Sequence, residues 1–327
     1  MEVQERKAMK KQLRRYLGVP GWTMLIYYGM MNISVFLWTI LEALTNVWGQ
    51  LRRNDFTALE DALHLALESG WGYFPPALLG LLILLLWKKP RFWKEQIWAK
   101  GKPMKAGHFF EILFVFLGAQ FLAQMSLTLV EVGLNGFGLT ILEGMEALSA
   151  GSDNLSFFLY AGILAPITEE ILFRGLIQRL MLPYGRNFAI FVSAFTFSLY
   201  HGNLIQGPLA FLLGLILGYV AAEYSIGWAM LLHMINNLVL ADALPRLIFD
   251  LPIELAGLIN TAVLLALAVA GAVVLIRRRE SIRAWIRREP INGTCFGCYL
   301  TSLGTVVSIL VLGAVIVLTT RSMITPL

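Results

Sequence analysis

The sequence predicts an all-α membrane protein, a polytopic bundle of about nine transmembrane helices. Of its 327 residues, 57% are hydrophobic and 14% are charged, whereas a soluble domain carries about 25% charged residues. The apolar residues form blocks close to the ~20 residues that span a bilayer as a helix. Lysines and arginines gather between these blocks, so the net charge of +5 indicates membrane orientation and not nucleic-acid binding.

Nine apolar blocks are candidate spans. The fifth and sixth blocks are short, and they require deep burial in the bundle, tilt or local thinning of the bilayer. In chain order the blocks are 22–44, 73–88, 109–132, 157–181, 188–202, 208–223, 227–247, 257–276 and 303–320.

Basic residues fall in every second connection between these blocks, and the positive-inside rule therefore predicts a cytoplasmic N-terminus and an external C-terminus. The alternate connections are mainly acidic. The basic residues are Arg6, Lys7, Lys10, Lys11, Arg14 and Arg15, then Lys88, Lys89, Arg91, Lys94, Lys100, Lys102 and Lys105, then Arg186, then Arg277, Arg278, Arg279, Arg283, Arg287 and Arg288. The acidic residues are Asp55, Glu60, Asp61, Glu68, Glu143, Glu146 and Asp153.

Two segments between the spans have the pattern of amphipathic surface helices, Phe56–Glu68 and Leu139–Leu148. His64 lies in the first segment and is expected to be part of its polar surface. His108 follows a basic connection at a predicted membrane boundary, and we expect it to be interfacial.

The two cysteines, Cys295 and Cys298, form a single C-x-x-C pair. This count excludes a disulfide framework, and one pair supplies half of the four ligands of a structural zinc site. We expect two small, partly apolar residues in a loop, with a redox or metal role as the alternative.

An acidic pair, Glu169 and Glu170, lies inside the apolar segment 157–181 and is followed by Arg174. A charged side chain near the bilayer centre costs roughly 2.5–3.5 kcal/mol, so such residues indicate a functional site that faces the protein interior or a cavity. Glu170 and Arg174 are four residues apart and can pair on one helical face. Glu169 is rotated by about 100° from Glu170 and must address a different neighbour. The two carboxylates are therefore expected to have different roles.

Two further pairs follow on the next predicted helices, Phe197 with His201 and His233 with Asn237. A spacing of four places each pair on one face of its helix, about 40° apart. His233 and Asn237 are therefore expected to point together at one spot.

These groups suit the hydrolysis of an amide bond without a covalent enzyme intermediate. A carboxylate and an imidazole that share a water molecule can remove its proton as a general base. Imidazole N–H and carboxamide NH2 groups can donate hydrogen bonds to a developing oxyanion. The same side chains of Glu169, His201 and His233 could instead bind zinc, although the H-E-x-x-H motif of the common zinc proteases does not occur in the sequence.

Each group also has a non-catalytic interpretation. Buried ion pairs such as Glu170 with Arg174 occur in transporters and in structural bundles. His201 can serve a turn at a helix end, and His233 and Asn237 can form hydrogen bonds between helices, as is common in membranes. The ordered occurrence of all three groups within about 70 residues favours a site.

In these groups the sequence resembles the CAAX protease and bacteriocin-processing family (the CPBP or ABI family), which includes the type II CAAX prenyl endopeptidases. The family motifs E-E-x-x-x-R, F-x-x-x-H and H-x-x-x-N are present as TEEILFRG, FSLYHG and HMINN, and the resemblance covers residues 157–242. It implies an all-helical intramembrane endopeptidase in which Glu169 and His201 activate water. The resemblance assigns oxyanion stabilisation to His233 and Asn237, and a supporting role to Glu170, Arg174 and Phe197.

The resemblance implies no cofactor, with zinc as the alternative, and a membrane-associated protein or peptide as substrate in a bacterial plasma membrane. CAAX-like prenyl-protein processing, peptide maturation and bacteriocin immunity are all compatible with it. A non-enzymatic scaffold or immunity protein, and an ion- or proton-coupled transporter, are the alternative functions. The chain divides into an N-terminal membrane region with about three spans (1–156), a CAAX-protease-like core (157–247) and C-terminal spans with a basic cytoplasmic loop (248–327).

Overall fold

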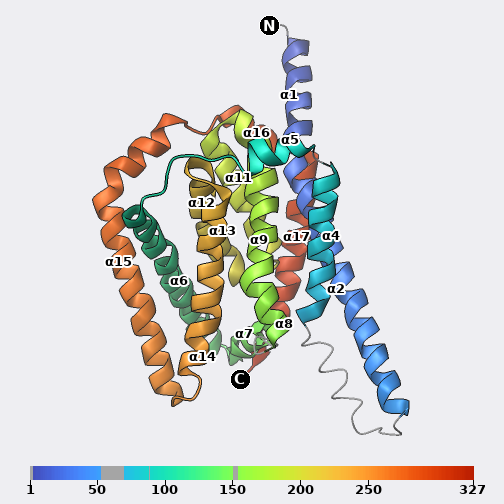
Figure 1. Cartoon of the computed structure of the whole chain (residues 1–327), viewed down its shortest axis with the longest axis vertical. Coiled ribbons are helices and arrows are strands. Elements are labelled where there is room, and N and C mark those ends of the chain that lie inside the picture. The colour runs from blue at the N-terminus through green and yellow to red at the C-terminus, as the bar shows by residue number, and fades with distance from the viewer. Residues whose placement is uncertain (1–2, 53–69, 88, 150–153) are drawn as a thin grey trace.

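The computed structural model describes residues 3–52, 70–87, 89–149 and 154–327. Within these ranges the chain is a helical bundle, and its sheet consists of two short strands, β1 (Leu139–Thr140) and β2 (Thr325–Pro326). Figure 1 shows most helices running along the long axis, with the N-terminus and the C-terminus at opposite ends. The predicted all-α class is confirmed.

Seven helical stretches in the described ranges are long and apolar enough to cross a membrane. The first contains α1 (Val3–Leu17) and α2 (Val19–Arg52), which follow one another closely. The others are α6 (Ala106–Asn135), the stretch Leu155–Tyr184, α12 (Gln206–Glu223), the stretch Ile226–Ile248, α15 (Ile253–Arg288) and α17 (Leu303–Ser322). The chain is therefore an integral membrane protein.

Two of the predicted spans are helical but short. The helix α4 (Phe74–Trp87) has 14 residues and α11 (Arg186–Tyr200) has 15. At ~1.5 Å per residue these helices are about 21–23 Å long, less than the ~30 Å hydrocarbon core of a bilayer. The count of nine spans therefore stays a prediction.

The basic segments meet at one end of the bundle, which we call the basic end. Figure 1 places α1, the short helices α5 (Pro90–Phe92) and α16 (Gly293–Leu300), and the last part of α15 at this end. The opposite end holds α7 (Leu142–Ser149), α14 (Leu244–Ile248) and the C-terminus. This segregation is what the alternation of basic and acidic connections predicts, and the assignment of the basic end to the cytoplasm stays a prediction.

Glu223, at the end of α12, holds three other segments together at the basic end. Its carboxylate accepts hydrogen bonds from Lys102 Nζ at 2.5 Å, Arg186 at 3.1 Å and Trp285 Nε1 at 2.8 Å. The Arg186 guanidinium also stacks 4.0 Å from the centre of the Trp285 ring. The connection before α6, the start of α11 and the end of α15 are thereby fixed to the core helix α12.

The helices α2 and α17 approach each other closely at glycines. A Cβ atom added at Gly304 would collide with the carbonyl oxygen of Gly18, and one added at Gly21 would collide with the carbonyl group of Gly304. Small residues at helix interfaces allow such close packing in membranes, where van der Waals contact is a main source of association. The first long apolar helix is therefore packed against the last.

Gly304→Ala is expected to lower the free energy of unfolding by about 1–3 kcal/mol, because the added methyl group must push two backbones apart. The measurement is thermal or denaturant unfolding of the purified protein in detergent. Gly313→Ala on the same helix is the matched control, because nothing lies within 4 Å of its added Cβ. Equal stability of the two variants would contradict the proposed importance of this contact.

The two predicted surface helices have different outcomes. The segment Phe56–Glu68, with His64, lies outside the described residues. The prediction of a helix beginning at Leu139 is wrong, because Leu139 and Thr140 pair with the C-terminal tail in the β1–β2 ladder and the helix α7 begins only at Leu142. Glu131 stabilises this turn by accepting hydrogen bonds from Thr140 Oγ1 at 2.8 Å and from the Ile141 N–H at 2.9 Å.

The C-x-x-C pair lies on a helix, so the prediction of a loop is wrong. Both cysteines belong to α16, whose N-terminus is capped by Asn292 through hydrogen bonds from the N–H groups of Thr294 and Cys295. Both are free thiols. Burial raises the pKa of the Cys295 thiol, which disfavours the reactive thiolate form.

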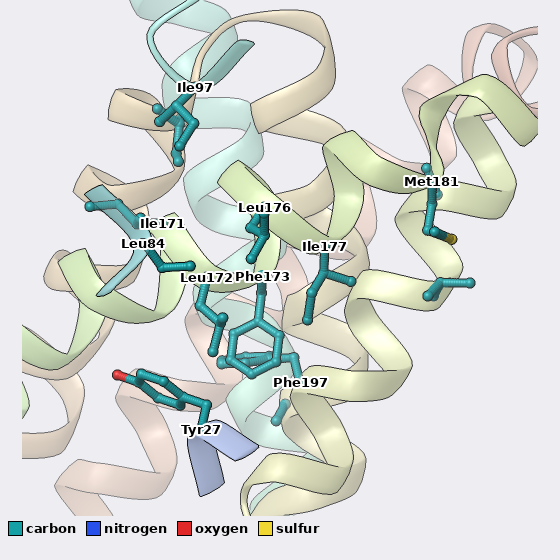
Figure 2. Packing of buried hydrophobic residues seen from close by; sticks show 14 of the residues in the cluster. Tyr27, Leu84, Ile97, Ile171, Leu172, Phe173, Leu176, Ile177, Met181 and Phe197 are labelled. Carbon is teal, nitrogen blue, oxygen red and sulfur yellow. The ribbon is translucent and has the colours of Figure 1, made fainter. Parts of the chain in front are cut away.

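The largest hydrophobic cluster surrounds the stretch Leu155–Tyr184 at the centre of the bundle. Figure 2 shows side chains of this stretch, including Leu172, Phe173 and Ile177, packed with Tyr27 from α2 and Phe197 from α11. Phe173 and Ile177 have no exposed surface. This packing fixes the helix that carries the acidic pair.

Candidate active site

The acidic pair lies at the end of a short α-helical segment between wider π-helical turns. The chain passes through α8 (Leu155–Leu159), the π-helical segment η3 (Tyr160–Leu164), α9 (Ala165–Glu170), the π-helical segment η4 (Ile171–Gln178) and α10 (Arg179–Met181). Proline lacks an N–H group and disturbs the hydrogen bonds of the preceding turn, and Pro166 lies next to η3. Such π-helical turns frequently occur at functional sites.

Glu170 and Arg174 form the ion pair that their spacing predicts. Arg174 Nη1 donates to Glu170 Oε1 at 2.9 Å, and neither side chain has any exposed surface. Arg174 Nη2 also donates to the Gly214 carbonyl oxygen of α12 at 3.3 Å. Its guanidinium lies 4.4 Å from the centre of the Phe197 ring, a distance that allows a cation–π interaction. The arginine therefore joins three helices around the buried Glu170.

His233 lies between the two glutamates. It belongs to α13 (Ile226–Ile235), and its Nδ1 is 3.0 Å from Glu170 Oε1 while its Nε2 is 3.8 Å from Glu169 Oε2. Glu170 Oε1 thus contacts both Arg174 and His233. The Glu170 carboxylate orients the imidazole, in the way that carboxylates commonly orient histidines at catalytic sites.

Glu169 is the more accessible of the two carboxylates. Its side chain is 12% exposed, whereas that of Glu170 is fully buried. Among the described residues, Glu169 has the 3.8 Å contact with His233 but accepts no direct hydrogen bond. The two acids therefore differ as their 100° separation predicts, with Glu170 engaged in structure and Glu169 free to hold a water molecule.

Phe197 connects the two histidines. Its ring centre is 4.7 Å from that of His201 and 5.8 Å from that of His233, both in edge-to-face arrangements. His201 Nδ1 is 2.9 Å from the Phe197 carbonyl oxygen. Because a carbonyl oxygen only accepts hydrogen bonds, Nδ1 carries the proton, and Nε2 is left with a lone pair that can take a proton from water. The turn after α11 contains Gly202 at φ 67°, a left-handed conformation that glycine adopts readily.

Asn237 and His233 contact different groups. It belongs to the π-helical segment η6 (Asn236–Ala243), and its Nδ2 donates to the Ala161 carbonyl oxygen of η3 at 2.7 Å. His233 contacts the glutamates and Asn237 contacts Ala161, and the prediction that the two side chains point together at one spot stays a prediction. The change from α-helix to π-helix at Asn236 alters the angular relation that a spacing of four has in a regular helix.

A hydrogen-bond chain that the sequence motifs do not include fixes the amide of Asn237. Asn236 Nδ2 donates to Asn237 Oδ1 at 3.1 Å, and Gln120 Nε2 on α6 donates to Asn236 Oδ1 at 2.7 Å. We call Gln120, Asn236 and Asn237 the amide chain. The sequence offers one sign of this chain, because Gln120 is a polar residue inside an apolar helix. Polar side chains in membrane helices commonly form hydrogen bonds to another helix.

In the part of the chain that the structure describes, the candidate zinc ligands do not lie together as a metal site. In the described parts of the chain, no three side chains of His, Cys, Asp or Glu converge as metal ligands. Within the set Glu169, His201 and His233, one nitrogen of each histidine already contacts another group, Phe197 for His201 and Glu170 for His233. These side chains would have to rearrange to ligate zinc together.

Comparison with known proteins identifies the segment that contains this site. A family model described as "Type II CAAX prenyl endopeptidase Rce1-like" matches residues 151–239. The matched segment includes Glu169, His201, His233 and Asn237, and it confirms the resemblance predicted from the three motifs. No curated protein and no solved structure matches the chain. Gln120 and α15 lie outside the matched segment.

Proposed function

From the match to a CAAX-type protease family, which implies intramembrane protease activity, we propose that this chain is an intramembrane endopeptidase that uses Glu169 and His201 to activate water. The observation that supports it best is the unequal environment of the two glutamates. Glu170 is held by Arg174 and His233, while Glu169 is partly accessible and accepts no direct hydrogen bond from a described residue.

The proposed reaction begins with a water molecule held by the Glu169 carboxylate. A carboxylate with free lone pairs accepts the proton of the water as a general base, and the unprotonated Nε2 of His201 is a second acceptor. The oxygen of the water attacks the carbonyl carbon of the scissile peptide bond. The proton is then delivered to the leaving amine, so the products are a carboxylate and an amine and no covalent enzyme intermediate forms.

The oxyanion that forms on the attacked carbonyl needs hydrogen-bond donors. Asn237 uses one of its two amide hydrogens on Ala161, which leaves the second free to donate. Nδ1 of His233 faces Glu170, so Nε2 is the nitrogen that is left to face the oxyanion. Nε2 can donate a hydrogen bond when the ring carries both protons. We assign the oxyanion role to these two side chains, and the role of holding them to Glu170, Arg174 and Phe197.

The experiment that tests the function is comparative peptidomics. Membranes that contain the wild-type chain are compared with membranes that contain Glu169→Gln at equal expression. Peptides that accumulate only with the wild-type chain would identify the substrate, which we expect to be a membrane-associated protein or peptide. A phenotype that survives both Glu169→Gln and His201→Ala would instead favour the scaffold or immunity function.

A zinc-dependent reaction at the same residues is the alternative chemistry. It would require Glu169, His201 and His233 to rearrange around the ion, since they do not converge in the described structure. Zinc would supply a more acidic bound water molecule. Elemental analysis of the purified, active protein distinguishes the two proposals, because only the alternative requires stoichiometric zinc.

Gln120→Leu is expected to lower kcat by about tenfold, with little change in KM, because it releases the amide chain that positions Asn237. The effect should be smaller than the ~10²–10³-fold loss that follows removal of a direct oxyanion donor, for which Asn237→Ala is the reference. Gln124→Leu is the matched control, since Gln124 lies one turn away on α6 and bonds to Thr261 of α15 instead. Equal kcat losses for the two glutamine variants would show a general packing effect.

We also propose that α4 and α11 complete a nine-span topology with the basic end in the cytoplasm. The support is the location of the N-terminus and the C-terminus at opposite ends of the bundle and the gathering of basic segments at one of them. The bilayer of a bacterial plasma membrane would then have the C-terminus on its outer side.

A further inference from the structure

A cavity of about 410 Å³ lies at the basic end, where α1 meets α2 and the junction of α16 with α17. Three of its lining residues carry a positive charge, and none carries a negative charge. The lining residues are Lys11, Arg14, Arg15, Gly18, Trp22, Thr301, Leu303 and Gly304. We call this space the basic cavity.

The three cations of the basic cavity are available to a ligand. Lys11, Arg14 and Arg15 are all exposed, and in the described part of the chain none of them forms an ion pair. They lie within about one turn of α1, and repulsion between like charges at this spacing is relieved by an anion. The net charge at this point therefore favours an anionic group.

The start of α17 contributes a second favourable feature. Leu303 and Gly304 are the first residues of this 20-residue helix, which follows the N-cap Ser302. The first N–H groups of a helix have no acceptor within the helix, and the helix dipole places about half a positive charge there. The Ser302 side chain accepts from the Thr305 N–H, while Leu303 and Gly304 line the basic cavity.

The position of the basic cavity favours a lipid as its ligand over a soluble anion. It lies where the charged helix α1 gives way to the apolar helix α2, and Trp22, which is 41% exposed, lies at this boundary. Tryptophan is enriched at the membrane–water interface. Further along, α2 and α17 expose large apolar side chains to the surroundings, such as Ile26, Ile33 and Leu310. An anionic headgroup fits the charge of the basic cavity, and acyl chains fit this apolar surface, so a ligand that has both suits the site.

We propose that the basic cavity binds the phosphate headgroup of an anionic phospholipid, with the acyl chains lying along α2 and α17. Basic pockets between transmembrane helices are suited to such headgroups. The proposal is independent of the proteolytic function, because the lining residues lie outside the segment 151–239.

The test is a lipid titration of the purified full-length protein in a zwitterionic detergent, followed by native mass spectrometry. The probes are phosphatidylglycerol, phosphatidylcholine with the same acyl chains, and inorganic phosphate. We expect one saturable site for phosphatidylglycerol, with at least tenfold weaker binding of both other probes. Binding of phosphatidylcholine with equal affinity, or of inorganic phosphate with equal affinity, would overturn the proposal, the latter by identifying a free-anion site.

Variants locate the site on the chain. Lys11→Gln/Arg14→Gln/Arg15→Gln is expected to weaken phosphatidylglycerol binding roughly 100-fold, since each basic residue near an anionic surface contributes about a factor of five. Arg277→Gln/Arg287→Gln/Arg288→Gln is the matched control, because it removes the same charge from exposed positions of α15. Equal weakening in both triple variants would show delocalised attraction and overturn the proposal.

A second variant keeps all the basic residues in place. Leu303→Glu introduces a carboxylate at a position that is 70% exposed and lines the basic cavity. We expect it to weaken phosphatidylglycerol binding without loss of fold, since the wild-type side chain is largely free of packing. Unchanged affinity in this variant would contradict the location of the headgroup.

Discussion

Glu169→Gln is expected to lower peptide-bond hydrolysis by about 10²–10⁴-fold, the contribution typical of general acid–base catalysis. Glutamine has the shape of glutamate but cannot take a proton from water at neutral pH. The free energy of unfolding should change little, because Glu169 accepts no direct hydrogen bond from a described residue and only faces His233 at 3.8 Å. The measurement is turnover of a peptide identified by the peptidomic comparison, with purified protein in detergent or liposomes.

Two control variants distinguish the loss of a catalytic carboxylate from the general effect of removing a negative charge. Glu254→Gln removes a carboxylate in the exposed first turn of α15 and should leave turnover unchanged. Glu170→Gln should impair both turnover and stability, because Glu170 contacts both Arg174 and His233. Wild-type turnover in Glu169→Gln would refute the proposed role of this carboxylate.

Arg174→Met is expected to lower the free energy of unfolding by about 3–5 kcal/mol, the cost typical of removing one partner of a buried ion pair. The substitution leaves the buried Glu170 carboxylate without its cation and also removes the hydrogen bond to Gly214. The measurement is denaturant unfolding in detergent. Glu170→Gln/Arg174→Met should recover part of the loss, since neither buried charge is then left alone.

Arg179→Met is the matched control for this stability effect. Arg179 lies five residues further along the same helical stretch and makes one long hydrogen bond of 3.4 Å, to the Ala221 carbonyl oxygen. We expect a clearly smaller loss than for Arg174→Met. A double variant as unstable as Arg174→Met alone would mean that the loss comes from packing and not from the unpaired charge.

The parts of the site that depend on helical spacing were predictable from the sequence. Glu170 and Arg174 pair because residues four apart share a helical face, and the same geometry separates Glu169 from Glu170. The contact of His233 with both glutamates was not predictable, because it depends on how α13 packs against α9 in the folded chain. The sequence identifies which side chains are costly in a membrane but not which of them meet.

The different partners of Asn237 and His233 accompany a change of helix type that the spacing rule does not include. A spacing of four predicts a shared direction only in a regular α-helix, and the helix becomes π-helical at Asn236. The donor from α6, Gln120, is distant in sequence and could be recognised only as a polar residue in an apolar helix. The amide chain could therefore be recognised only from the tertiary structure.

The fold was predictable at the level of apolar blocks and less so at their ends. Composition and the ~20-residue length requirement identify the long helices, whereas α4 and α11 are too short for that criterion. The helix that contains Cys295 and Cys298 could have been recognised from Asn292, a favoured N-cap residue. The β1–β2 ladder could not, because it joins residues from the middle of the chain to its last residues.

The glycine contact between α2 and α17 has a consequence for biogenesis. Ribosomes deliver the chain from its N-terminus, so α2 enters the bilayer long before α17, its closely packed neighbour, has been made. Until then, Gly18 and the face of α2 that carries Gly21 must be covered by lipid or by an insertion factor. In the folded chain, α17 takes the place of this temporary cover against α2. The close contact between the two helices can therefore form only after α17 has been made and inserted.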